Sequence, residues 1–108
     1  MDDWNKAKHY FKENFDPHID LSGIIYIIGV QELGKGPGKF NKDQKIDLMH
    51  IAICTLLEPY GYYSYQGNDK DGWPHFEPTE SLPQLKPLEQ ERLVKSSIFD
   101  YLKSNGLL

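Results

Sequence analysis

IDLSGIIYIIGVQEL, residues 19–33, is the most apolar stretch of the sequence and the expected centre of its core. A segment with apolar side chains all round is normally buried on every side. It is too short and too interrupted to cross a bilayer, which needs about 20 apolar residues. Its isoleucines would also suit a strand, but its length and Gly34 at its end favour a helix. We predict a buried helix that Asp16 caps and that begins at Pro17.

Helical spacing marks three further segments of the chain. The first follows a cap at Asp2 or Asp3, and its apolar face is expected at Trp4, Ala7, Phe11 and Phe15. The next begins after Asn41, where Gln44 completes a capping box, and runs to Leu57. Its core face is expected at Ile46, Met49, Ile53, Leu56 and Leu57. The last helix opens at Pro87 and ends at Asn105-Gly106, with Leu107 folded back toward Leu102.

Two aromatic segments between these helices predict a β-hairpin. The strands are expected at Tyr60–Gln66 and Trp73–Glu77, on either side of a turn-rich loop at residues 67–72. A hairpin symmetric about this loop pairs Tyr63 with Phe76 and Ser64 with His75. The sequence therefore predicts one α+β domain over residues 1–108, mainly helical, with three N-terminal helices, a hairpin and a C-terminal helix around one core.

The composition limits the possible functions and compartment. The chain of 108 residues carries 12 basic and 16 acidic residues, a net charge of −4 that disfavours nucleic acid as a partner. Its single cysteine excludes an internal disulfide and a cysteine-only zinc site. The first residues lack the features of a secretory signal. We expect a cytoplasmic protein that does not enter a membrane.

The predicted hairpin carries the densest group of aromatic side chains in the sequence. Strand alternation places Tyr63, Tyr65 and Phe76 on one face. The opposite face then holds Tyr60, Tyr62, Trp73 and His75, and it is exposed unless the C-terminal helix or the Pro-rich segment covers it. Tyr and Trp dominate binding hot spots. We therefore expect an interaction module without a cofactor that docks a protein partner, or a second copy in a homodimer, through these four residues.

A metal site or a small enzyme is the alternative interpretation. Asp47, His50 and Cys54 are spaced i, i+3 and i+7, so one helical face can present all three. These residue types bind zinc or iron, and His75 or Glu32 could join them. No second cluster completes such a site, and a free cysteine is most often a small buried hydrophobe.

A glycine-lysine loop before the helix at Asn41 is a weaker candidate for an anion site. It carries Lys35, Lys39 and Lys42, and backbone N–H groups at a helix N-terminus can hold an anion. The spacing is not that of a P-loop, because Phe40 follows Lys39 where a hydroxyl would be needed. A solvated loop is the simpler interpretation.

The order of three helices and a hairpin over residues 1–78 resembles a winged helix-turn-helix in outline. The resemblance implies a DNA-associated regulator whose third helix reads a groove and whose hairpin loop touches phosphates. The third helix here presents Asp43 and Asp47, and the loop carries Asp69 and Asp71. Because phosphate contacts come from cations, DNA binding is the third hypothesis.

Overall fold

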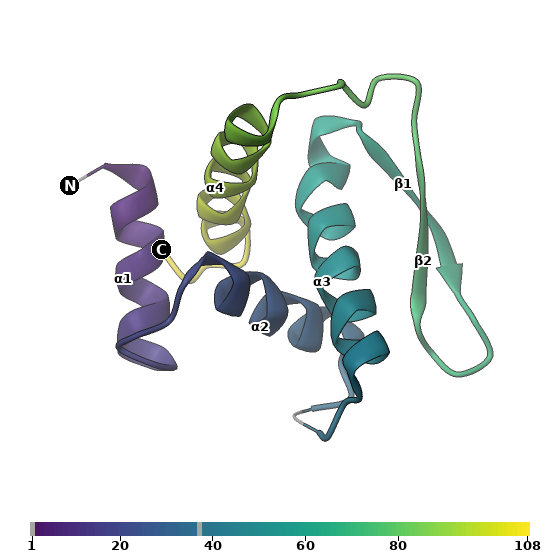
Figure 1. Ribbon diagram of the computed structural model, residues 1–108, viewed down its shortest axis with the longest axis horizontal. Coiled ribbons are helices and arrows are strands. Elements are labelled where there is room, and N and C mark those ends of the chain that lie inside the picture. Colours follow the sequence, from purple (N-terminus) through teal and green to yellow (C-terminus); the bar gives the residue numbers. More distant parts are fainter. Residues whose placement is uncertain (1, 37) are drawn as a thin grey trace. The chain divides into compact units, whose positions relative to one another are not determined.

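The computed structural model describes residues 2–36 and 38–108 (Figure 1). Its elements are, in order, α1 (Asp3–Asn14), α2 (Leu21–Leu33), α3 (Lys42–Leu57), the 3₁₀ helix η1 (Glu58–Tyr60), β1 (Tyr63–Asn68), β2 (Pro74–Pro78) and α4 (Pro87–Ser104). With 58% of the chain in helices and 10% in strands, the protein is α+β and mainly helical, as predicted. The described residues form two compact units. We call α1 with α4 the helical unit, and α2, α3, η1 and the hairpin the hairpin unit.

In the helical unit, the helix boundaries follow the predicted signals. Asp2 caps α1 by accepting a hydrogen bond of 2.8 Å from the Asn5 N–H, and Ala7 and Phe11 are buried. Phe15 does not continue this face as predicted, because it lies beyond the last turn and is 46% exposed. In α4 the buried residues are Ser97, Ile98 and Leu102.

The end of α4 has the predicted Schellman geometry. Gly106 has a φ of +71°, which favours glycine. The Leu107 N–H donates to the Leu102 carbonyl at 2.9 Å, and the Gly106 N–H donates to the Lys103 carbonyl at 3.1 Å. These two bonds satisfy carbonyl groups that the helix itself leaves open.

The isoleucine-rich segment is a helix, α2, as predicted. Its start is different: Asp16 accepts a bond of 2.9 Å from the His18 N–H and closes a separate turn, and the helix begins only at Leu21. Gly34 ends it with a φ of +73°, and its N–H donates to the Val30 carbonyl. None of the described helices is both long and apolar enough to span a membrane.

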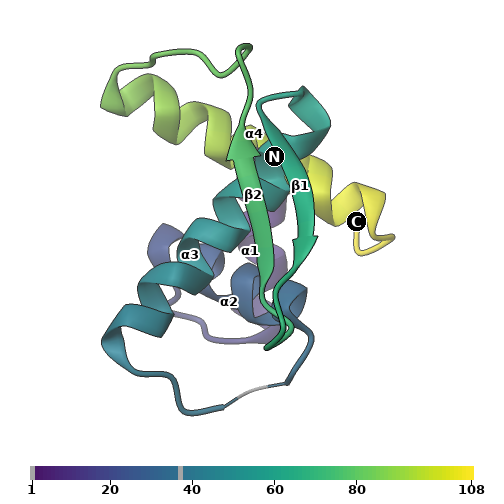
Figure 2. The same cartoon turned by 90° about the vertical axis from the view of Figure 1, so that its right-hand side faces the viewer.

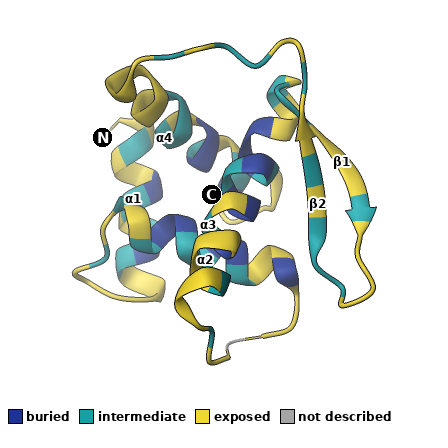
Figure 3. Cartoon of the chain, turned by 45° about the vertical axis from the view of Figure 1, so that its right-hand side comes forward, coloured by how far each residue is buried: buried dark blue, intermediate teal, exposed yellow. Residues whose placement is uncertain are grey.

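The crossing of α2 and α3 is unusually close at one point. A Cβ atom on Gly29 would lie 2.1 Å from the carbonyl oxygen of Leu48, so only glycine fits there. Ile24, Ile28 and Leu48 are fully buried, and the buried residues of the two helices are seen in dark blue in Figure 3. This contact fixes α3 against α2.

The capping box of α3 is confirmed, but its predicted core face is partly wrong. Asn41 accepts from the Gln44 N–H at 2.8 Å, and the Gln44 side chain accepts from the Asn41 N–H at 3.0 Å. Ile46 is 57% exposed. The buried residues are Leu48, Ile51, Ala52, Cys54, Leu56 and Leu57. Because α2 packs on one side of α3 and the hairpin on another, the buried face is wider than one apolar stripe and turned away from Ile46.

The hairpin is antiparallel, as predicted, with a different register. Tyr65 pairs with Phe76 and Ser64 with Glu77, and Gln66 bulges out before the pairing resumes at Gly67. Tyr60 does not belong to the strand: it ends η1, and Gly61 then turns the chain with a φ of +81°. Compared with the symmetric prediction, Tyr65 replaces Tyr63 opposite Phe76, and Glu77 replaces His75 opposite Ser64.

Candidate functional site

A pocket of about 280 Å³ lies within the hairpin unit, between α3 and the hairpin. The hairpin runs along α3 in both views of the ribbon (Figure 2). The helix contributes Asp47, His50 and Ile51 to the lining. The hairpin contributes the remaining residues: Asp69, Trp73, Pro74, His75 and Phe76. Polar groups thus face an aromatic and apolar wall, which is a common composition of ligand sites.

The α3 side of the pocket combines an apolar residue with two polar ones. Ile51 is buried, whereas Asp47 and His50, at i and i+3, are exposed on the same side of the helix. The His50 Nε2 lies 3.5 Å from the Cys54 Sγ, and the His50 ring meets the Tyr63 ring edge-on with 6.4 Å between centroids. His50 is therefore positioned from both α3 and β1.

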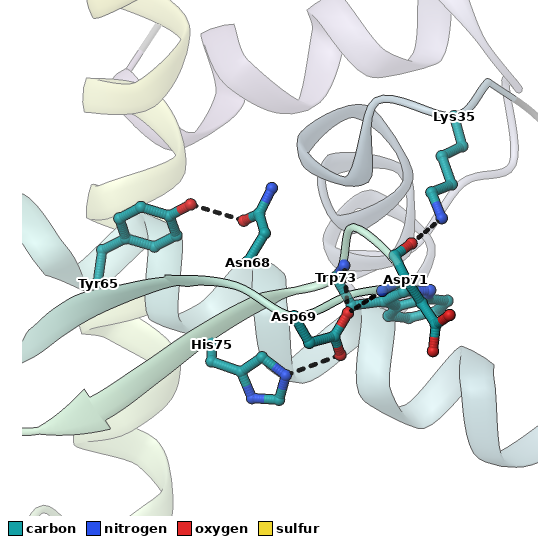
Figure 4. A network of polar contacts seen from close by, with 7 residues as sticks. All are labelled: Lys35, Tyr65, Asn68, Asp69, Asp71, Trp73 and His75. Carbon is teal, nitrogen blue, oxygen red and sulfur yellow. Dashed lines mark hydrogen bonds and ion pairs between the residues drawn. The ribbon is translucent and has the colours of Figure 1, made fainter.

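Asp69 organises the hairpin side of the pocket (Figure 4). Its Oδ1 accepts hydrogen bonds from the backbone N–H groups of Asp71 at 2.9 Å and Trp73 at 3.0 Å. Its Oδ2 lies 2.9 Å from the His75 Nε2. The bond from His75, and then the backbone bonds, lower the pKa of Asp69 because they favour the charged form. The ionised carboxylate thus holds Trp73 and His75 at the pocket.

The loop after α2 also contacts the hairpin loop. The Lys35 Nζ donates to the Asp71 carbonyl, and Phe40 meets Trp73 edge-on with 6.3 Å between ring centroids. The Lys35 ammonium, predicted to help hold an anion, is therefore engaged with a carbonyl of the hairpin loop. Lys39 and Lys42 are exposed.

The charge of the pocket lining is negative when its histidines are neutral. The described residues that line it include two carboxylates, Asp47 and Asp69, and no lysine or arginine. Such a lining attracts a cation and repels a phosphate. The aromatic residues Trp73 and Phe76 add apolar surface beside these charges.

The predicted metal set is not assembled as a site. Across residues 2–36 and 38–108, no three His, Cys, Asp or Glu side chains come together in a group that could hold a metal ion. Cys54 is fully buried, and burial raises its pKa to about 11, so the thiol keeps its proton at neutral pH. Burial, and then the charge of Cys54, also raise the pKa of Tyr63. The geometry gives the metal interpretation no support.

The four residues predicted to dock a partner do not share one face of the hairpin. Tyr60 and Tyr62 lie before β1, with 5.9 Å between their ring centroids. Trp73 and His75 lie at the opposite end and line the pocket. The strand face that carries Ser64 and Glu77 also carries His75, and all three residues are exposed. The predicted four-residue strand face does not form, because Tyr60, Tyr62 and Trp73 lie outside the two strands.

Asp69 and Phe76 are pocket residues that the sequence reasoning did not assign to a site. Asp69 follows Asn68 in a turn-rich loop, where an aspartate side chain often bonds the backbone two residues ahead. That signal predicts the bond to Asp71 that the structure contains. Nothing in the local sequence shows that the same carboxylate reaches His75. Glu32, predicted as a possible addition to the metal or enzyme site, is exposed on α2 and is not part of the pocket lining.

No protein-family model, curated protein sequence or solved structure matches this chain. The residues that line the pocket belong to two of the predicted sets. They bring together Trp73 and His75, predicted to bind a partner, with Asp47 and His50, predicted as metal ligands.

Proposed function

We propose that this chain is a small cytoplasmic binding module whose site is the pocket between α3 and the hairpin. The observation that carries the proposal is the pocket itself, where polar groups of α3 converge on an aromatic wall. The Asp69 hydrogen bonds and the α3 capping box support it, because they hold both walls in place before any ligand arrives. The partner is a protein that inserts one side chain into the pocket.

The chemistry of the neighbouring groups favours binding over covalent catalysis. Cys54 is the only cysteine of the chain, and it is buried with a protonated thiol. A nucleophilic cysteine needs an accessible thiolate with a lowered pKa. The contact between Cys54 and His50, which both lie on α3, therefore orients the His50 ring and does not supply a nucleophile.

A fragment screen followed by backbone and indole N–H resonances tests the proposal. We expect bound fragments to shift the Ile51 amide and the Trp73 indole signals more than signals elsewhere in the chain. The substitution Asp47→Trp should block these shifts, because a large side chain at this exposed rim position fills the pocket entrance. Asp43→Trp is the matched control, since Asp43 is an exposed carboxylate one turn earlier on α3 and is not part of the lining.

Two outcomes of this screen would contradict the proposed function. Fragments that bind only at other surfaces would refute the proposal. So would fragments whose effects on Ile51 and Trp73 are the same in Asp47→Trp and Asp43→Trp, provided that both variants retain the dispersed spectrum of the parent protein.

A further inference from the structure

We infer that the group taken into the pocket is an arginine side chain of the partner protein; this inference rests on the proposed function. The first argument is charge. The lining holds the carboxylates of Asp47 and Asp69, and none of the described residues that line the pocket is a lysine or an arginine. A guanidinium brings the complementary charge, whereas a phosphate or an acidic side chain would be repelled.

The two carboxylates have different roles. Asp69 already accepts bonds from Asp71, Trp73 and His75, so its oxygens are engaged in holding the loop. Asp47 is exposed on α3 and can turn its carboxylate toward the pocket mouth. A carboxylate accepts two parallel N–H bonds from one guanidinium, and this bidentate pairing fixes the orientation of the ligand. Asp47 is therefore the residue that binds the cation, and Asp69 is a positioning residue.

The wall of the pocket selects arginine over lysine. Trp73, Pro74 and Phe76 present aromatic and apolar surface on the hairpin side. A guanidinium is planar, weakly hydrated and able to lie against an aromatic ring, while an ammonium is a compact and strongly hydrated charge. A pocket of about 280 Å³ is large enough to admit one arginine side chain. The net charge of −4 further favours a basic protein segment as partner.

Three capped tripeptides test this assignment: acetyl-Gly-Arg-Gly-amide, the same peptide with lysine, and the same peptide with citrulline. Citrulline keeps the shape of arginine and loses its charge. The readout is the Trp73 fluorescence in a Trp4→Phe background, which leaves Trp73 as the only tryptophan. We expect the arginine peptide to bind at least about tenfold more tightly than the citrulline peptide, because citrulline loses one charge-assisted pairing. The arginine peptide should also bind more tightly than the lysine peptide.

Substitutions on α3 complete the experiment. Asp47→Asn should weaken arginine binding by about tenfold, and Asp43→Asn, with the same change of charge four residues away, should change it less than twofold. Both positions are exposed, so both variants should fold. Equal binding of the citrulline and arginine peptides, or equal effects of the two substitutions, would overturn the inference. In that case, fragments that bind in the pocket would still support the proposed function. A screen that finds no fragment in the pocket would instead refute the proposed function itself.

Discussion

Cys54 shows how strongly the position of one residue controls its chemistry. Burial raises its pKa from 9.0 to about 11, so the unfolded chain loses the thiol proton at lower pH than the folded chain does. The free energy of unfolding should therefore be unaffected by this group below pH 9 and should fall as the pH rises from 9 to 11. Two pKa units correspond to about 2–3 kcal/mol.

Urea denaturation at several pH values measures this dependence. Cys54→Ala should lower the free energy of unfolding by a similar amount at every pH below 9 and should lack the additional loss between pH 9 and 11. If the parent protein and Cys54→Ala lose stability in parallel over that range, the thiol does not carry the shift.

At the same scale, the sequence predicts which single residues belong to the pocket better than it predicts which side chains contact one another. Asp47 and His50 were singled out from their spacing on one helix, and they do line the same pocket. Cys54, two turns after Asp47, is fully buried instead. The pairing of His75 with Asp69 could not be predicted, because the bulge at Gln66 and the loop geometry together decide where the His75 ring lies.

At the scale of the elements, the packing of the hairpin unit depends most on the contact between α2 and α3. A methyl group on Gly29 would collide with the backbone of Leu48, which cannot move aside as a flexible side chain can. Gly29→Ala should therefore separate the helices and lower the free energy of unfolding by about 2–4 kcal/mol, in spite of the better helix propensity of alanine. Ser22→Ala, at an exposed position of the same helix, should change it by less than about 0.5 kcal/mol. Thermal and urea unfolding of both variants measure the difference, and equal stabilities would show that the crossing is not tight.

The elements themselves were predicted best where a local signal marks their ends. Asn41 with Gln44, and Gly106 with Leu107, gave helix boundaries that the structure confirms. The core face of α3 was missed because two different neighbours, α2 and the hairpin, cover the helix. The hairpin register was missed because the sequence shows a turn-rich loop but does not show which residue bulges.

At the scale of the whole molecule, the pocket is a product of long-range packing. One wall comes from α3, within residues 47–51, and the other from the hairpin, within residues 69–76. The periodicity of the sequence describes α3 and the hairpin separately and contains no information on the distance between them. The sequence therefore predicts single residues of the site but not the pocket that they form. The expectation of one domain is likewise a statement about the whole chain, and unfolding can test it.

The two tryptophans allow that test, because Trp4 belongs to the helical unit and Trp73 to the hairpin unit. Each unit is smaller than the roughly 70 residues below which a single core rarely supplies more than about 3–5 kcal/mol of stability. We therefore expect the chain to unfold in one cooperative transition. Trp4→Phe leaves Trp73 as the fluorescent probe, and Trp73→Phe leaves Trp4. For each variant, the fluorescence midpoint in urea should coincide with the midpoint of the helical circular dichroism signal. A fluorescence midpoint that separates from the helical one in either variant would show that the two units unfold independently, and residues 1–108 would then be two domains.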